Sequence, residues 1–290
     1  MPGFKSTKEL VDAELSGANK ISTWRKTPSQ TTASGFWFDL SMSPGNPNPQ
    51  YYAAAPLTAV RMAYSTDGGL VHGLAVSPEK KFLKKIMAFT TLATAVPMPM
   101  ILLDYLLFYP FIDEGTNDVQ PLDNTATLSR YADGVGVGIM PVVVAAGDGV
   151  AAVHTFTCTY TNSAGVADRV TQPVALTTQT VTGTLATSSS AGAATSGPFL
   201  PLQSGDSGVR SIQSVTFTGT TDVGLITLVL VKPLAQMSIR GIDAPVEVEY
   251  LVDFGNMPEI KDDAYLNFIC HPGGTLSAAP IHGLIETVWG

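Results

Sequence analysis

Charged side chains are scarce in this sequence of 290 residues. Asp, Glu, Lys and Arg make up 14% of it, against about a quarter in a typical globular protein. Apolar residues make up 45%, so we expect part of the surface to be hidden in an assembly rather than exposed to water. The net charge of -8 argues against nucleic acid as a specific partner, because a phosphate-binding surface needs an excess of Lys and Arg.

Cysteine and targeting signals are nearly absent as well. Cys158 and Cys270 are the only cysteines. Both lie in apolar, strand-like runs, which favours buried free thiols in a reducing compartment over a disulfide. The first ten residues, MPGFKSTKEL, lack the apolar segment of a secretory signal, and Pro2 stands where myristoylation requires glycine.

One long uncharged run, residues 86–103, is the only candidate for a membrane span. Pro97, Pro99 and several threonines interrupt it, and Asp104 follows directly. A transmembrane helix needs about 20 predominantly apolar residues. We therefore predict no membrane-spanning segment and no membrane partner.

Turn-forming residues and alternating patterns indicate a protein that is mainly β. The sequence has 20 prolines and 27 glycines, and residues 151–162 alternate between apolar and threonine positions. We predict a β-sandwich, jelly-roll-like, that forms a single β-rich domain over residues 35–290. Residues 183–197 are small and polar, which predicts a flexible loop.

Two segments have helical patterns. Ser77 and Pro78 are typical of a helix start, and Phe82, Ile86, Phe89 and Ala93 follow at helical spacing. A second apolar run follows Pro97, and its periodicity does not separate helix from strand. Together they predict a helical insertion around 78–110.

The other helical pattern defines an N-terminal helical arm, residues 1–34. Ser6 and Glu9 form a capping box, and Gly17 is a natural helix stop. A helix of about three turns is not stable alone in water, so Leu10, Val11 and Leu15 need a receiving surface. The positive charge of residues 1–30 on an acidic chain favours a neighbouring molecule, and docking on the parent domain is the alternative.

Four lysines crowd the start of the predicted insertion helix: Lys80, Lys81, Lys84 and Lys85. Cations are disfavoured there by the helix dipole, and like charges four residues apart repel. We therefore expect them, with Lys81 and Lys85 as the test positions, to contact an acidic neighbour. The alternative is a solvated face whose aliphatic stems cover apolar surface.

The tetrapeptide Gly-Asp-Ser-Gly at 205–208 frames the nucleophile of chymotrypsin-like serine proteases. Catalysis would need a histidine and a carboxylate earlier in the chain. Two sets have the right order: His154, Asp168 and Ser207, or His72, Asp118 and Ser207. The first set is spaced too tightly, and the second spans the predicted helix where such a protease has barrel strands. The tetrapeptide is also a good turn, so we predict that the protein is not an enzyme.

No cofactor or metal site is predicted. His154, Cys158, Cys270 and His271 are a nominal zinc-ligand set. Adjacent residues of a strand point to opposite faces, which argues against a closed tetrahedral site.

Several stretches resemble a group of tailed-bacteriophage virion proteins that are mostly uncharacterised. The matching runs are ISTWRKTPSQTT, FDLSMSPGNPNPQYYAA, ATAVPMPMILLDYLLFYPFID, FLPLQSGDSGVRSIQSVTF, LVLVKPLA and AYLNFICHPGGTLSAAPIHGLIETVWG. This resemblance implies a component of the virus particle, such as a head decoration or cement protein, assembled in the cytoplasm of the bacterial host. It implies no catalytic residues.

The residues themselves favour the same function. Few charges and a distinct basic arm fit a protein that binds neighbouring capsid subunits and forms a homo-oligomer, since repetition on a lattice multiplies modest contacts. Two alternatives remain. A major capsid subunit would carry a long helix and an extended arm, and a tail or host-binding component would use loop 183–197 for display.

Overall fold

The computed structural model describes residues 3–28, 35–147, 154–176, 181–187, 197–219, 223–242, 244–278 and 280–290. The described chain is mainly β, as predicted, with three antiparallel sheets and three short helices. The helices are α1 (Thr7–Leu15), α2 (Tyr64–Asp67) and α3 (Tyr250–Phe254), and the 3-10 turns are η1 (Leu40–Met42) and η2 (Ala93–Ala95). None of the helices in these ranges is long and apolar enough to span a bilayer.

Sheet 1 has the strand order β14-β5-β17-β1-β3, and β15 also pairs with β5. Its strands are β1 (Asn19–Lys26), β3 (Gly45–Asn46), β5 (Lys81–Thr90), β14 (Val246–Glu249), β15 (Glu259–Ile260) and β17 (Ile281–Trp289). The first and last long strands of the chain are neighbours in this sheet, since β1 pairs with β17 along its whole length.

Sheet 2 has the order β2-β16-β6-β13-β8, with β4 paired to β6. Its strands are β2 (Phe38–Asp39), β4 (Val60–Arg61), β6 (Met98–Asp113), β8 (Gly138–Ala145), β13 (Leu225–Ile239) and β16 (Tyr265–Cys270). β6 and β13 are the two longest strands and pair along almost their full length. The continuous apolar run of β6 suits a strand that is covered on both faces.

Sheet 3 has the order β10-β9-β12-β7, with β11 paired to β9. Its strands are β7 (Gln120–Pro121), β9 (His154–Asn162), β10 (Arg169–Val170), β11 (Val174–Leu176) and β12 (Val209–Gly219). The predicted alternation in β9 is confirmed at Phe156, Cys158 and Tyr160, which are all buried.

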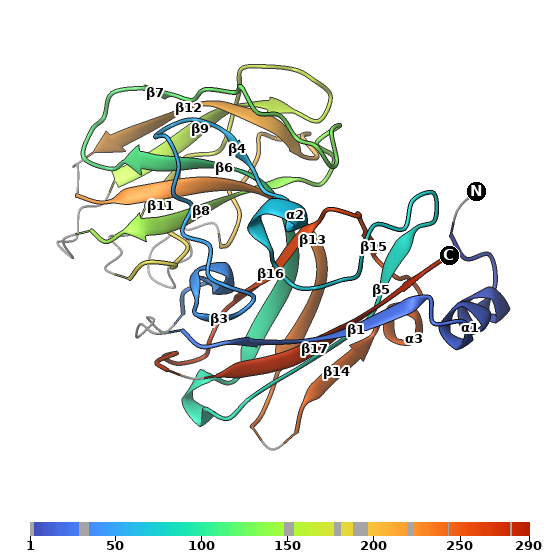
Figure 1. The fold of residues 1–290 in the computed structure, drawn as a ribbon. Coiled ribbons are helices and arrows are strands. Elements are labelled where there is room, and N and C mark those ends of the chain that lie inside the picture. The colour runs from blue at the N-terminus through green and yellow to red at the C-terminus, as the bar shows by residue number, and fades with distance from the viewer. Residues whose placement is uncertain are drawn as a thin grey trace.

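The three sheets form two lobes that share sheet 2 (Figure 1). In the first lobe, sheet 1 packs on one half of sheet 2 around a core that includes Trp24 and Phe268. In the second lobe, sheet 3 packs on the other half around a core that includes Phe156 and Phe217. β6 and β13 contribute side chains to both cores.

Bulges allow one face of these long strands to cover both cores. On β6, Met100 and Leu102 point into the first core, while Leu107 and Tyr109 point into the second. Strict alternation would place even and odd residues on opposite faces. The pairing with β13 shifts between Tyr105 and Leu107, where β6 has one residue more than β13. This extra residue of β6 inverts the alternation of its side chains.

The predicted helical insertion at 78–110 is wrong, because the segment forms β5 and β6. Along β5, buried positions alternate at Lys81 and Leu83 and resume at Ile86. A register shift against β17 falls between Leu83 and Lys85. The helical spacing of Phe82, Ile86 and Phe89 combined both faces of this strand, because Ile86 is buried in the first core whereas Phe82 and Phe89 are half-buried outside it.

The N-terminal helix is confirmed, and the next part of the predicted arm lies within sheet 1. Ser6 caps α1 by accepting the Glu9 N–H at 3.2 Å, and Gly17 follows the helix with φ +81°. Residues 19–26 form β1, whose Trp24 is buried in the first core. The predicted boundary at residue 34 lies outside the described residues.

The predicted flexible loop, 183–197, is described only in part. Residues 184 and 185 are buried and form β-bridges with Phe38 and Val142. These bridges join the start of the segment to sheet 2, and flexibility of the loop stays a prediction. Residues 188–196 lie outside the described part of the chain.

Candidate interaction surface

A short helix, α3, protrudes from the first lobe between β14 and β15. The sequence favours a helix of one turn here, since Asp253 accepts the Glu249 N–H at 2.9 Å. Gly255 ends the helix with φ +67° and donates its N–H to Leu251. The helix exposes two apolar side chains, Val252 (74% exposed) and Phe254 (58% exposed).

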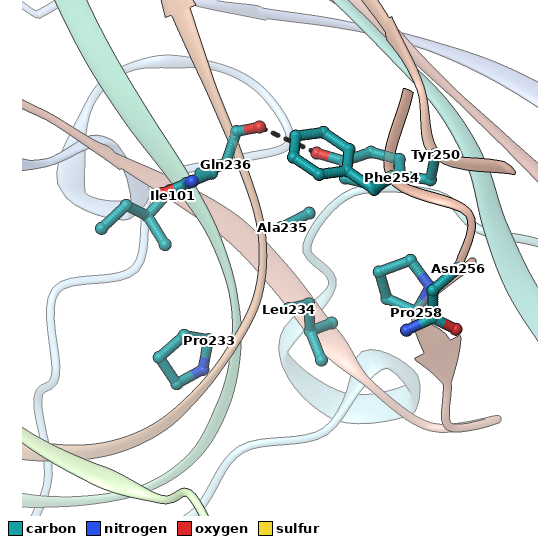
Figure 2. A pocket seen from close by; sticks show the side chains of 9 residues that line it. All are labelled: Ile101, Pro233, Leu234, Ala235, Gln236, Tyr250, Phe254, Asn256 and Pro258. Carbon is teal, nitrogen blue, oxygen red and sulfur yellow. Dashed lines mark hydrogen bonds between the residues drawn. The ribbon is translucent and has the colours of Figure 1, made fainter. Parts of the chain in front are cut away.

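A hollow of about 450 Å³ separates α3 from β13 (Figure 2). The Tyr250 side chain reaches from α3 to β13, and its hydroxyl donates to the Gln236 carbonyl at 3.0 Å. Burial raises the pKa of Tyr250, so this hydroxyl stays a proton donor. The Phe254 ring stacks on the Tyr250 ring, with centroids 5.6 Å apart. One partly buried hydrogen bond and one ring contact thus hold Phe254 at the mouth of the hollow.

The part of β13 that borders this hollow is an open sheet edge. β8 pairs only with Leu225–Val231, so the second half of β13 has β6 as its sole strand partner among the described residues. Ser238 lies opposite Pro99, whose carbonyl accepts the N–H of His271, the residue after β16, at 2.9 Å. The backbone groups of Pro99 therefore face β16, and those of Gln236 and Ser238 face the hollow.

Two further hollows adjoin the first. One of about 880 Å³ lies between the open edge of β13 and β14, and it shares Ile101, Gln236 and Phe254 with the first. The other, of about 240 Å³, lies between α3 and α1 and shares Asn256. We call these three hollows around α3 the α3 trough.

The charges at the α3 trough are mostly paired within the chain. Glu247 forms an ion pair with Lys85 at 2.9 Å, and Asp253 is engaged as the cap of α3. The exposed centre of the surface is thus apolar and aromatic with polar groups around it. Protein interfaces have the same arrangement of an apolar core and a polar rim.

The sequence-predicted contact residues fall in different environments. Leu10 is buried and lines the hollow between α1 and α3, whereas Val11 and Leu15 of α1 are exposed. Lys85 lies at the rim of the trough through its pair with Glu247. Lys81 is buried, and its ammonium donates to the Leu74 carbonyl at 2.8 Å. The structure thus brings Leu10 and Lys85 to the α3 trough, while Val11 and Leu15 extend along α1.

The premise of a crowded helix start is wrong, because all four lysines precede or belong to strand β5. Lys80 pairs with Glu259 at 3.1 Å, and Lys84 pairs with Glu14 and Glu286. Each lysine has an acidic partner within the chain. A contact of these lysines with a second molecule stays a prediction.

The Gly-Asp-Ser-Gly segment is a turn of the second lobe that leads into β12. The Asp206 carboxylate accepts hydrogen bonds from Arg169 at 2.9 Å, from Tyr160 and from Asn162 at 2.7 Å. These bonds, led by that of Arg169, lower the pKa of Asp206 to about 2. The Ser207 hydroxyl lies 2.9 Å from the Ser163 hydroxyl.

His72, the histidine of one candidate catalytic set, does not meet this serine in the described structure. His72 is buried in the first lobe, with Nε2 2.9 Å from the Ala264 carbonyl. The side chain of His154 lies outside the described residues. The predicted absence of enzymatic activity stays a prediction.

The two cysteines are free and buried, as expected, and lie in different cores. Burial raises the pKa of both thiols, which suits packing rather than metal binding. Within the described ranges, no three His, Cys, Asp or Glu side chains lie close enough to hold a metal ion.

The α3 trough was missed by sequence reasoning. The run VEVEYLVDF, residues 246–254, reads as one strand, whereas only Val246–Glu249 is a strand. Gly255 directly after Phe254 was the available local signal, since glycine commonly follows the last turn of a helix. No comparable signal marks the open edge of β13.

Comparison with known proteins assigns no family. No family model and no curated protein matches the sequence. Among solved structures, the infectious bursal disease virus VP2 subviral particle aligns at 8% identity over 93% of this chain and 80% of that chain, with a TM-score of 0.16. The T=1 particles derived from infectious bursal virus align at 8% identity over 93% and 77%, with a TM-score of 0.18. Scores this low do not establish a common fold, so the function is argued from the chain itself.

Proposed function

We propose that this protein is a non-enzymatic structural component of a tailed-bacteriophage particle. Its proposed role is that of a capsid-associated decoration or cement protein, which binds neighbouring subunits on the head. The proposed location is the virion, after assembly in the cytoplasm of the bacterial host. The sequence resemblance to phage virion proteins supports the class, and the surface of the first lobe supports a binding role.

The α3 trough is the observation that carries this proposal. Phe254 is exposed and lines two of the three adjoining hollows, Val252 is exposed on the same helix, and the Tyr250 hydrogen bond holds the helix in place. Aromatic side chains next to well-formed pockets are typical anchors of protein interfaces. An exposed strand edge in the same trough offers backbone hydrogen bonds to an extended segment of a partner.

A weak contact through the α3 trough suits a particle component, because each copy would sit on a lattice of identical partners. Several weak contacts held at fixed spacing bind far more tightly together than each does alone. The low charge content also favours association, because covering apolar surface lowers the free energy.

The decisive experiment compares incorporation of two matched variants into particles. Val252→Asp introduces a charge on the exposed face of α3, beside the trough, and we expect about a tenfold or greater loss of incorporation, because an apolar anchor of an interface is desolvated on binding. Val166→Asp is the control, because Val166 is exposed on a turn of the second lobe. Both positions are exposed, so both variants should fold and melt as the wild type does. Equal incorporation of both variants would refute the role of the trough.

Copy number and a deletion strain separate the alternatives. Hundreds of copies per particle, with shells that still assemble without the protein, identify a decoration protein. Hundreds of copies with no shell in the deletion strain identify a major capsid subunit. A handful of copies identifies a tail or host-binding component, and absence from purified particles would refute a virion role.

A further inference from the structure

A buried ammonium group holds an irregular loop on the first lobe. Lys81 of β5 is buried, and its Nζ donates to the Leu74 carbonyl at 2.8 Å and lies 3.2 Å from Nδ1 of His72. Nε2 of His72 lies 2.9 Å from the Ala264 carbonyl. A carbonyl only accepts, so Nε2 carries the proton and Nδ1 accepts from the ammonium.

A carboxylate holds the other side of the same loop. Asp262 accepts the N–H groups of Val76 at 3.0 Å and Ser77 at 3.3 Å. It also lies 3.5 Å from the Lys81 ammonium. Lys81, His72 and Asp262 thus form one network that fixes residues 71–79, which we call the clamped loop. Burying an ammonium is costly, and here the buried ammonium specifies the shape of a loop without regular structure.

The clamped loop presents an apolar side chain to solvent. Leu74 is 84% exposed, although its own backbone carbonyl is bound by the buried ammonium. The loop lies beside the C-terminal end of β17, where Lys80 and Gly290 exchange backbone hydrogen bonds (Figure 1). Leu74 is therefore a protruding leucine on a fixed support.

A hollow of about 550 Å³ lies directly beside Leu74. Its apolar wall comes from Tyr64, Val71, Val76 and Trp289, and Lys20 and Glu79 also line it. Cavities of about 150 Å³ already admit a benzene-sized group, so this hollow has room for a leucine side chain. Lys20 and Glu79 are exposed, and neither forms an ion pair with another described residue.

We propose that the clamped loop is a self-association surface whose occupant is a second copy of this chain. Two copies related by a twofold axis would each place Leu74 in the hollow of the other. A protrusion next to a hollow on one face is self-complementary, as a twofold interface requires. The charges fit the same arrangement, because Lys20 of each copy would face Glu79 of its partner.

This surface is separate from the α3 trough. The hollow beside Leu74 and the three hollows of the trough share no lining residue. A dimer formed through the clamped loop would keep both troughs available for other partners. The inference therefore goes beyond the proposed function and fails or succeeds independently of it.

The test is the association state of the purified full-length chain, measured by sedimentation velocity over a range of concentrations. We expect a reversible dimer for the wild type and a monomer for Leu74→Asp. Leu74 is exposed, so the variant should keep the wild-type melting temperature. Val252→Asp is the matched control, and it should dimerise as the wild type does. A monomeric wild type at all concentrations, or a dimer unaffected by Leu74→Asp, would overturn the proposal.

A charge exchange tests the proposed pairing across the axis. Lys20→Glu and Glu79→Lys alone each create like-charge contacts between copies, and each should weaken dimerisation about tenfold. The double variant Lys20→Glu with Glu79→Lys restores opposite charges and should recover the wild-type dimer. Single variants that associate normally, or a double variant that stays monomeric, would exclude this pairing. Val252→Asp incorporation into particles reports on the proposed function separately.

Discussion

The two lobes are built on one shared sheet but differ in the cationic side chains that bind their irregular segments. The first lobe buries two lysines, and each binds backbone carbonyls of an irregular segment: Lys26 holds Ser43 and Pro47, and Lys81 holds Leu74. In the second lobe, a partly exposed Arg169 holds the Asp206 turn.

This difference shows what the buried lysines achieve. Burial lowers the pKa of Lys26 to about 8, with a partial opposing effect of Asp39, because burial disfavours the charged ammonium. Both buried lysines fix irregular loops of the lobe that also carries the α3 trough and the clamped loop. These two buried lysines thus lie where the surface has a defined shape without regular secondary structure.

The largest expected effect concerns how much of the N-terminus belongs to the first lobe. Deleting residues 2–30 should abolish cooperative unfolding, because it removes β1 and the buried Trp24 from sheet 1. Deleting only residues 2–17 should leave a cooperative transition at a lower temperature. Circular dichroism melts of both truncations distinguish these outcomes. A native-like melt of the longer truncation would show instead that residues 1–30 are a separable arm.

The second prediction tests whether the lobes unfold together. Trp24→Ala in the first core and Phe156→Ala in the second should each cost about 3–5 kcal/mol. Because β6 and β13 pass through both cores, each variant should shift one common transition. Calorimetry checks this through equality of the calorimetric and van't Hoff enthalpies. Two transitions, with each variant moving only one, would show that the lobes are independent.

The third prediction assigns an acid sensitivity to the first lobe. Burial, and then the charge of Lys81, lower the pKa of His72 to about 4. The unfolded chain takes up this proton near pH 6.5, so between these values it binds more protons than the folded chain. Stability from this group is present above about pH 6.5 and is lost as the pH falls towards 4. The full loss is about 3 kcal/mol, at about 1.4 kcal/mol per pKa unit.

Denaturant unfolding at pH 7 and pH 4.5 measures this effect. His72→Gln keeps an amide that can donate to Ala264 and accept from Lys81, but it does not titrate. Its stability should therefore fall less between the two pH values than that of the wild type. Equal losses in both proteins would assign the acid sensitivity to other groups.

The smallest expected effect is at Ser207 in the second lobe. A fluorophosphonate probe should not label it, because activation needs a general base and the side-chain partner of its hydroxyl is the Ser163 hydroxyl at 2.9 Å. Ser207→Ala should change stability by no more than about 0.5 kcal/mol, as for a typical surface substitution. Stoichiometric labelling that disappears in Ser207→Ala would establish a reactive serine and contradict the non-enzymatic proposal.

Sequence reasoning succeeded where the signals are local. The cap at Ser6, the stop at Gly17 and the alternation of β9 each depend on residues a few positions apart, and the structure confirms all three. The mainly β class follows from the same local evidence repeated along the chain.

Sequence reasoning failed where a bulge changes the period or where distant segments meet. On β5, Phe82, Ile86 and Phe89 have helical spacing but do not share a face of the strand, which carries a bulge between Leu83 and Lys85. The α3 trough combines residues near 4–10, 37, 82, 99–101 and 233–258, and nothing in any one segment indicates the others. The burial of Lys81 likewise depends on His72 and Asp262, which come from other parts of the chain.

The passage of β6 and β13 through both lobes also has a mechanical consequence. Domains joined by a linker can reorient when one of them is bound, but these lobes have two hydrogen-bonded strands in common. When the first lobe tilts, the second lobe must therefore move with it as one rigid body. On any surface that holds α3, the far end of the molecule would project at a fixed angle, and only bending of the shared sheet could change its direction.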